Sequence, residues 1–400
     1  MKYILIFSIS FWAVFSSFSL SAQSDAPKTE MRAVWIATVD NIDFPDSPTT
    51  DSRLQQENFI RLLDYHHNNG INTVIVQVRP ASDAFYPSPF EPWSHWLTGI
   101  QGAEPVPFYD PLGFMISETH KRGMEFHAWV NPYRAVNNIT TCTLSDCHIK
   151  FQHPEWLIQY GDKYFYDPGN KEVQRYVVEV VSDIVRRYDV DAIHIDDYFY
   201  PYPVQGLTFN DNKTFARYGS GMKRDDWRRS NTDSIVYNLY SSIKKIKKNC
   251  QFGVSPFGVW RNADRDPRGS KTQAGPTNYD FLFADILLWL KNGWVDYVAP
   301  QLYWEMTSKH VPFDVVLDWW SRNTYGVNCY IGLGVYRAGS NRAWSDRNLL
   351  PKQIKKVRET PNMKGMMFYS SNSLEKNLNG WGDSLRLNYF KMPANTPKLK

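Results

Sequence analysis

The feature that most constrains the fold is a set of eight short runs rich in β-branched and aromatic residues, separated by stretches of helical periodicity. The runs are 33–40, 73–79, 125–131, 192–197, 252–257, 297–303, 330–336 and 365–371. The helical stretches are 55–68, 111–122, 171–188, 232–248, 280–292, 315–323 and 350–359. Parallel strands that are each followed by a helix close most simply as a barrel. The sequence therefore predicts an α/β fold, a (β/α)8 TIM barrel.

The connections between these elements are of two kinds. Those that enter strands are short, as at Asn69-Gly70-Ile71-Asn72, where a helix C-cap turns directly into the next strand. Those that leave strands are long and rich in Pro, Gly, Asn and aromatic residues, at 80–109, 132–169, 198–231 and 258–279. Because TIM barrels build their active sites from the loops after the strands, we expect the site at this end of the barrel.

A single domain accounts for most of the 400 residues, with the barrel expected over 29–393 and a disordered tail over 394–400. Residues 1–22 are typical of a signal peptide, with Lys2, then an apolar run over 3–18, then small residues over 19–22. We therefore expect an exported protein, periplasmic or extracellular. No later run is long and apolar enough to predict a membrane span.

Composition narrows the possible partners. The net charge is only +4, and residues of both signs are mixed along the chain, so we expect no nucleic-acid partner. Aromatic residues make up 16% of the chain, and their flat faces suit sugar rings as well as core packing. The oligomeric state is left open.

The four cysteines do not have metal-ligand spacing, and we expect no metal site and no cofactor. Cys142 and Cys147 are close enough in sequence to close a small loop as a disulfide, an alternative that the sequence leaves open. Cys250 and Cys329 precede apolar runs and are expected to be buried thiols.

The fourth run carries the sharpest chemical signal, because ionisable residues follow directly from apolar ones in Ala192-Ile193-His194-Ile195-Asp196-Asp197-Tyr198. A period of two places Ile193 and Ile195 toward the helices, and His194 and Asp196 toward the barrel interior. Asp196 is therefore expected at the mouth of the barrel. Asp197, at the junction with the loop, is expected either to raise the pKa of Asp196 by like-charge repulsion or to bind a sugar hydroxyl.

The sixth run supplies a possible second carboxylate. The same period places Gln301, Tyr303 and Glu305 on one face of this strand. Cleavage of a glycosidic bond uses two carboxyl groups, one as acid and one as nucleophile or base. The sequence therefore predicts Asp196 and Glu305 as a catalytic pair that face each other across a cleft, with Asp197 beside them.

Further polar and aromatic residues lie at the ends of other runs or in the long loops and are candidates for substrate binding. This expected binding set consists of Asp40, Gln77, Arg79, His127, Asn131, Arg134, Tyr198, Gln301, Tyr303, Trp304, Tyr336, Trp93 and Trp96. Their concentration at one end of the predicted barrel indicates a site for a glycan substrate.

Several of these segments resemble the glycosyl hydrolase-like 10 family, also called the DUF187 family. They are RAVWIATVDNID at 32–43, QVRPASDA at 77–84, WSHWLTG at 93–99, HAWVNPYR at 127–134, HIDDYFYP at 194–201 and APQLYW at 299–304. The resemblance covers most of the chain between residues 31 and 373. Its strand-four Asp-Asp-Tyr motif corresponds to Asp196, Asp197 and Tyr198.

The resemblance implies a TIM-barrel glycosidase outside the cytoplasm, and one bacterial member that works at the division septum hydrolyses peptidoglycan glycan strands without their peptides. Our hypothesis is a glycoside hydrolase of that kind, with the acid and nucleophile roles of the carboxylates and the retaining or inverting outcome left open. Alternatives are a barrel that binds glycans without chemistry, another exported polysaccharide hydrolase, or a metal-dependent deacetylase.

Overall fold

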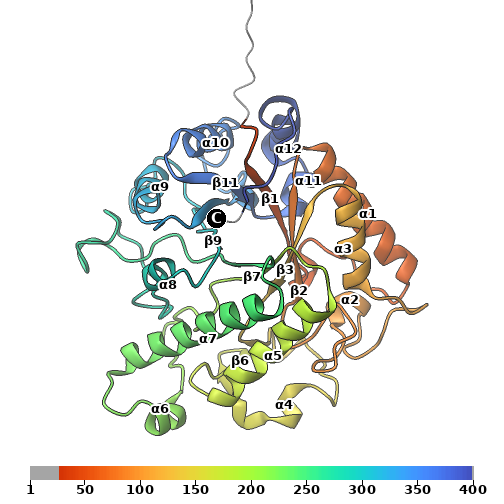
Figure 1. Cartoon of the computed structure of the whole chain (residues 1–400), viewed down its shortest axis with the longest axis vertical. Coiled ribbons are helices and arrows are strands. Elements are labelled where there is room, and N and C mark those ends of the chain that lie inside the picture. The colour runs from red at the N-terminus through yellow and green to blue at the C-terminus, as the bar shows by residue number, and fades with distance from the viewer. Residues whose placement is uncertain (1–26, 399–400) are drawn as a thin grey trace, which may run out of the picture.

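The computed structural model describes residues 27–398 and shows a closed barrel of eight parallel strands (Figure 1). Around the barrel the strands follow the order β1-β11-β10-β9-β8-β7-β3-β2. Their bounds are β1 Met31–Ile36, β2 Thr73–Arg79, β3 Glu125–Val130, β7 Ala192–Ile195, β8 Gln251–Val254, β9 Tyr297–Val298, β10 Asn328–Leu333 and β11 Met363–Phe368. The predicted TIM barrel is confirmed.

Helices surround the barrel, and each of the seven predicted helical stretches contains one (Figure 1). These are α1 Ser52–Asn68, α3 Pro111–Lys121, α5 Lys171–Arg187, α7 Arg224–Ile246, α8 Ile286–Asn292, α9 Phe313–Arg322 and α10 Leu349–Glu359. Five further helices in the described chain are α2 His95–Thr98, α4 Ile149–Gln152, α6 Asn212–Tyr218, α11 Ser371–Glu375 and α12 Trp381–Ser384. Side-chain caps begin α1 and α3, where Asp51 and Asp110 accept from backbone N–H groups of the first turn.

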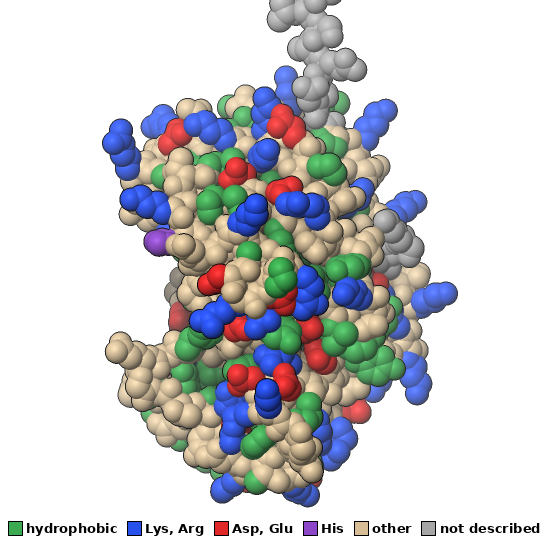
Figure 2. Space-filling model, turned by 90° about the vertical axis from the view of Figure 1, so that its left-hand side faces the viewer, with side chains coloured by type: hydrophobic (Ala, Val, Ile, Leu, Met, Phe, Trp, Pro, Cys, Tyr) green, Lys and Arg blue, Asp and Glu red, His purple; other side chains and the backbone are tan. Residues whose placement is uncertain are grey.

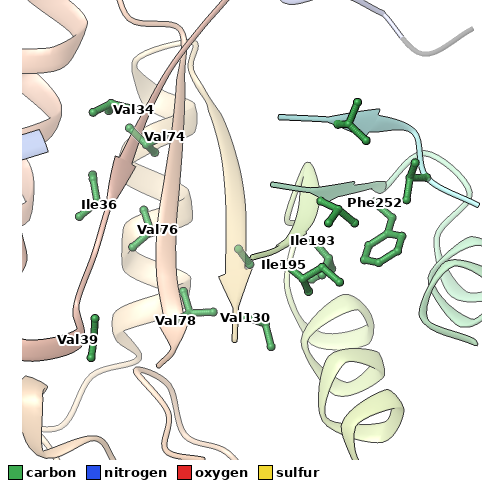
Figure 3. Packing of buried hydrophobic residues seen from close by; sticks show 14 of the residues in the cluster. Val34, Ile36, Val39, Val74, Val76, Val78, Val130, Ile193, Ile195 and Phe252 are labelled. Atoms are coloured by element: carbon green, nitrogen blue, oxygen red, sulfur yellow. The ribbon is translucent and has the colours of Figure 1, made fainter. Parts of the chain in front are cut away.

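The alternation of residues along the strands builds two separate cores. One set of strand side chains packs between the barrel and its helices, among them Val34, Ile36, Val74, Val76 and Ile193 (Figure 3). The other set fills the inside of the barrel and consists of Met31, Ala33, Trp35, Ala37, Ile75, Trp129, Ala192, Tyr297, Ala299, Tyr330 and Met367. Burial of each large apolar side chain contributes about 1.5–3 kcal/mol, so both cores favour this strand register.

A small antiparallel sheet lies within the connection between β3 and α5. It consists of β4 Arg134–Val136, β6 Lys163–Tyr166 and β5 Leu157–Tyr160, in that order. Arg134 pairs with Phe165 in the register of β4 and β6. This sheet holds the backbone of Arg134 in regular structure at the mouth of the barrel.

Several predicted boundaries differ from the structure. The sixth run forms a strand only over Tyr297–Val298, and α7 begins eight residues before the expected start at residue 232. Residues 394–398 were expected to be disordered, but Asn395 bridges to Thr29, and Asn72 Nδ2 donates to the carbonyl of Ala394 at 3.0 Å. These hydrogen bonds hold the end of the described chain against the floor of the barrel.

All four cysteines are free thiols, Cys250 and Cys329 being buried as expected, so the structure holds no disulfide between Cys142 and Cys147. The predicted signal peptide at residues 1–22 lies outside the described residues. Within the described part of the chain, none of the helices has the length and apolar character needed to cross a membrane.

Candidate active site

A cleft of about 680 Å³ opens at the end of the barrel where the strands finish. Its walls come from the strand ends and from the long loops after them. It is lined by Trp35, Trp129, Asp196, Asp197, Tyr198, Tyr202, Ser255, Phe257, Gln273, Ala274, Gly275, Pro276, Gln301, Tyr303, Trp304, His310, Val311, Tyr336, Arg337 and Tyr369. Two carboxylates, eight Trp or Tyr side chains and two side-chain amides therefore face one space.

Asp196 follows the last residue of β7 and is buried in the wall of this cleft. Its Oδ2 accepts from Trp129 Nε1 and from Asn131 Nδ2, both at 3.0 Å. Burial raises the pKa of this carboxyl, while the guanidinium of Arg134 and the two N–H donors act against that rise. Asp196 therefore has the donors that an ionised carboxylate needs.

Asp197 lies beside Asp196 and is also buried. Its Oδ2 accepts a hydrogen bond from the hydroxyl of Tyr202. Burial, followed by repulsion from Asp196, raises the pKa of Asp197 to about 7. The carboxyl group of Asp197 therefore keeps its proton up to about neutral pH, next to an Asp196 carboxyl group that two side-chain N–H donors contact.

The base of the cleft rests on a chain of hydrogen bonds inside the barrel. Trp35 Nε1 donates to His194 Nε2 at 3.2 Å, so this nitrogen is an acceptor and His194 carries its proton on Nδ1. His194 Nδ1 lies 2.9 Å from the hydroxyl of Tyr297, which lies 2.9 Å from His127 Nδ1. His127 Nε2 in turn contacts Glu125 at 3.2 Å. Burial lowers the pKa of His194 well below its usual value, so this chain positions Trp35 with a neutral imidazole.

A second cavity of about 600 Å³ adjoins the cleft. The two share four lining residues, Trp129, Tyr198, Tyr202 and Tyr369. The second cavity also contains Asp40, Gln77 and Arg134. The side chains of Tyr198 and Tyr202 thus stand between two neighbouring spaces, one with the paired carboxylates and one with a buried arginine.

The structure brings many of the expected binding residues to these two spaces. Tyr198, Gln301, Tyr303, Trp304 and Tyr336 line the cleft. Gln301 Nε2 donates to the carbonyl of Ser255 at 2.9 Å, which fixes one end of its amide.

Glu305 does not face Asp196, and the prediction that the two flank one bond is wrong. Its Oε2 accepts from Trp344 Nε1 at 3.0 Å, and it lines a separate cavity with Arg342 and Asp346. The alternation that the prediction used ends early, because β9 stops at Val298 and both Tyr303 and Trp304 then line the cleft. A strict period of two cannot place two successive residues on one face.

Other expected binding residues serve different purposes. Arg79 is fully buried in an ion pair with Glu91, and His127 belongs to the hydrogen-bond chain below the cleft. Asn131 acts on Asp196 rather than lining either space. Trp93 and Trp96 pack in the loop after β2 and line neither the cleft nor the second cavity. The expectation that these five bind sugar is therefore not supported by their positions.

Several residues of the cleft were not predicted from the sequence. Trp129 lies two residues after His127 on β3, so the same alternation that selected His127 also places Trp129 inside the barrel. Trp35 has an equivalent position on β1. The segment 273–276 lies in the long loop 258–279 that was expected at this end of the barrel, but no sequence pattern singled out these residues or His310.

Across residues 27–398, no group of three or more His, Cys, Asp or Glu side chains is arranged to hold a metal ion. On the face that Figure 2 shows, acidic and basic side chains are interspersed rather than gathered by sign.

Comparison with known proteins adds independent information. Residues 30–347 match the family described as glycosyl hydrolase-like 10. The chain is 43% identical to glycosyl hydrolase YngK of Bacillus subtilis over all of this chain and 78% of that protein. It is 38% identical to glycosyl hydrolase DigH of Escherichia coli K12 over 88% of this chain and 85% of that protein.

Solved structures support the fold alone. The catalytic domain of a β-amylase from Paenibacillus polymyxa matches with a TM-score of 0.58, covering 92% of this chain and 99% of that one, at 12% identity. Identity at this level carries no information about substrate.

Proposed function

Because this chain belongs to the glycosyl hydrolase-like 10 family and is a glycoside hydrolase by that relationship, we propose that it is exported and cleaves peptide-free glycan strands of bacterial peptidoglycan. The export rests on the pattern of residues 1–22, and the substrate rests on the resemblance of the sequence to a family with a septal peptidoglycan hydrolase. The observation that carries the catalytic part is the pairing of Asp196 with Asp197 at the wall of the cleft.

In this mechanism Asp197 is the general acid. A carboxyl group with a pKa of about 7 keeps its proton near neutral pH and transfers it readily to the leaving glycosidic oxygen. Tyr202, whose hydroxyl donates to Asp197, orients the carboxyl group toward the cleft.

Asp196 is the anionic partner. Trp129 and Asn131 hold its carboxylate in one orientation through their two N–H groups. A fixed negative charge at this position stabilises the positive charge that develops on the sugar ring in the oxocarbenium-like transition state. A water molecule then forms the new bond to the anomeric carbon, and its proton restores the acid form of Asp197. The aromatic rings of Trp304, Tyr303 and Tyr336 supply flat faces against which neighbouring sugars stack.

The decisive experiment compares three carboxyl-to-amide variants of equal size on amidase-stripped peptidoglycan strands, with products identified by mass spectrometry. Asp196→Asn and Asp197→Asn are each expected to lower kcat by about 10²–10⁴-fold. Glu305→Gln is the matched control and is expected to stay within about threefold of the wild type, since its carboxylate contacts Trp344 outside the cleft. Circular dichroism verifies that each variant folds.

Two results would contradict the proposal. A folded Asp196→Asn variant that cleaves strands at the wild-type rate removes the catalytic assignment. Binding of strands by the wild type without release of any fragment replaces the hydrolase with a glycan-binding barrel. Cleavage confined to glycans other than peptidoglycan strands keeps the mechanism and changes the substrate.

A further inference from the structure

The second cavity contains a buried guanidinium without a carboxylate partner. Arg134 is only 7% exposed and lines this space. The two other deeply buried arginines both have partners, because Arg32 pairs with Glu30 at 2.8 Å and Arg79 pairs with Glu91. Among residues 27–398, Arg134 lies within 4.0 Å of no Asp or Glu oxygen, which distinguishes it from both.

The contacts that Arg134 does make leave most of its donors available. Its Nη1 reaches the carbonyl of Pro80 only at 3.5 Å, and its guanidinium lies over the ring of Tyr198 at 4.7 Å from the centroid. Stacking on an aromatic ring fixes the plane of the guanidinium while its N–H groups stay free at the edge. The side chain is therefore oriented, and it acts on Asp196 only through its charge, beyond the distance of an ion pair.

The two Asp residues that line this cavity, Asp40 and Asp162, form no ion pair with Arg134 and contact other side chains. Asp40 accepts from Asn137 at 3.1 Å, and Lys163 donates to the carbonyl of Asn137 and lies 3.7 Å from Asp162. Gln77 is a second group that lacks a partner: its Oε1 accepts from backbone N–H groups, but its buried Nε2 finds no acceptor. Two buried donors that face one cavity indicate a ligand that brings acceptor oxygens.

Burial of a charged group without a partner is unfavourable, and an incoming carboxylate offsets that cost. The planar fork of arginine matches a carboxylate through two parallel hydrogen bonds. We propose that this cavity is a subsite for a sugar that carries a carboxylate, and that Arg134 binds this carboxylate and so sets the substrate specificity.

The inference rests on the proposed function and gives it a chemical reason. In peptidoglycan the lactyl group of each N-acetylmuramic acid is joined to the stem peptide through an amide, which is neutral. Removal of the peptide exposes a lactyl carboxylate on every second sugar. A subsite with an unpaired arginine therefore selects strands from which the peptides have been removed, whereas an intact amide leaves the guanidinium without its partner.

The position of Arg134 links this subsite to the carboxylate pair. Asn131 Oδ1 accepts from the backbone N–H of Arg134 at 2.8 Å, and Asn131 Nδ2 donates to Asp196. Tyr198 lines both spaces. A strand that spans the two spaces thus places its carboxylate in one and its scissile bond in the other.

The test compares peptide-free strands with the same strands after methyl esterification of their carboxylates. Wild-type kcat/KM is expected to be about 10–100-fold higher on the free carboxylates, as for a charge-assisted hydrogen-bonded pair. Arg134→Gln is expected to lose that preference to within about threefold, whatever its absolute rate on either substrate. Arg342→Gln, which removes a positive charge outside the cleft, is the matched control and is expected to retain the preference.

A different outcome assigns Arg134 another role. If Arg134→Gln slows both substrates by the same factor, the arginine acts on Asp196 rather than on a substrate carboxylate, and the inference is overturned. An intact preference in Arg134→Gln overturns it as well.

Binding separates this inference from the proposed function. Calorimetry on the Asp197→Asn variant uses a peptide-free tetrasaccharide that contains N-acetylmuramic acid, together with its methyl ester. Tighter binding of the free acid, by about tenfold or more, supports the subsite even if the wild type cleaves no peptidoglycan strand. Equal affinities for the two ligands contradict the subsite, whatever the enzyme cleaves.

Discussion

The lower and upper halves of the barrel interior both contain buried polar groups, but they differ in how those groups are partnered. In the lower half, Glu125, His127, Tyr297 and His194 contact one another in a continuous chain. In the upper half, two carboxylates lie side by side, and Arg134 lacks a carboxylate of its own. Polar groups that satisfy one another stabilise a fold, whereas groups left without partners are available to a substrate.

The largest expected effect on stability lies in the upper half. The pKa of Asp197 is 3.8 in the unfolded reference and about 7 in the folded protein, so the protonated acid favours folding, and this contribution is lost as pH rises from about 4 to 7. Above pH 7 the ionised group therefore destabilises the fold. Asp197→Asn is expected to raise the free energy of unfolding at about pH 8 by up to about 4 kcal/mol, measured by urea denaturation.

The stability gain from Asp197→Asn should depend on pH. At about pH 4 the gain from Asp197→Asn should shrink toward zero, because the wild-type carboxyl is then protonated in the folded protein. A variant that is destabilised at pH 8 would show that Asp197 belongs with the satisfied groups of the lower half.

The next largest expected effect is a loss of stability when the hydrogen-bond chain in the lower half of the barrel is interrupted. Tyr297→Phe removes the hydroxyl that contacts both His127 and His194, and it leaves two buried ring nitrogens without partners. The free energy of unfolding is expected to fall by about 1–3 kcal/mol. Because this hydroxyl lies below the cleft, kcat should stay within about threefold, and a loss of activity as large as that of Asp196→Asn would erase the distinction between the halves.

The smallest expected effect is the change in kcat for each pH unit. If Asp197 is the general acid, kcat should fall by about tenfold per pH unit above about 7, which is about 1.4 kcal/mol. Initial rates between about pH 5 and pH 9 measure this slope, with the Tyr297→Phe variant as a control that keeps the same midpoint. A rate that stays constant up to pH 9 excludes Asp197 as the proton donor.

Local patterns predicted the barrel and the position of one of the two carboxylates expected to form a pair. Alternation along the fourth run placed Ile193 toward the helices and Asp196 at the mouth, because that strand is regular and fully buried. The same rule failed at Glu305, because β9 ends at Val298, isolated bridges continue the pairing only as far as Gln301, and Glu305 lies beyond them. A period of two is informative only while the strand lasts.

Local sequence patterns could not predict which distant residues form ion pairs with each other. Arg79 ends β2 and Arg134 follows β3, and both suggested sugar binding, yet only the structure shows that Glu91 neutralises the first. Glu91 belongs to a long loop whose path no sequence periodicity defines. The difference between a structural arginine and an available one is therefore a tertiary property.

The position of the chain ends at the floor of the barrel determines where the protein can be attached to a surface. The bridge between Thr29 and Asn395 brings both ends of the described chain together on the side opposite the cleft. A fusion partner or a surface tether attached after residue 398 would therefore leave the substrate entrance unobstructed. An immobilised form of the enzyme would present its mouth to insoluble polymer, which a tether near the loops after the strands would prevent.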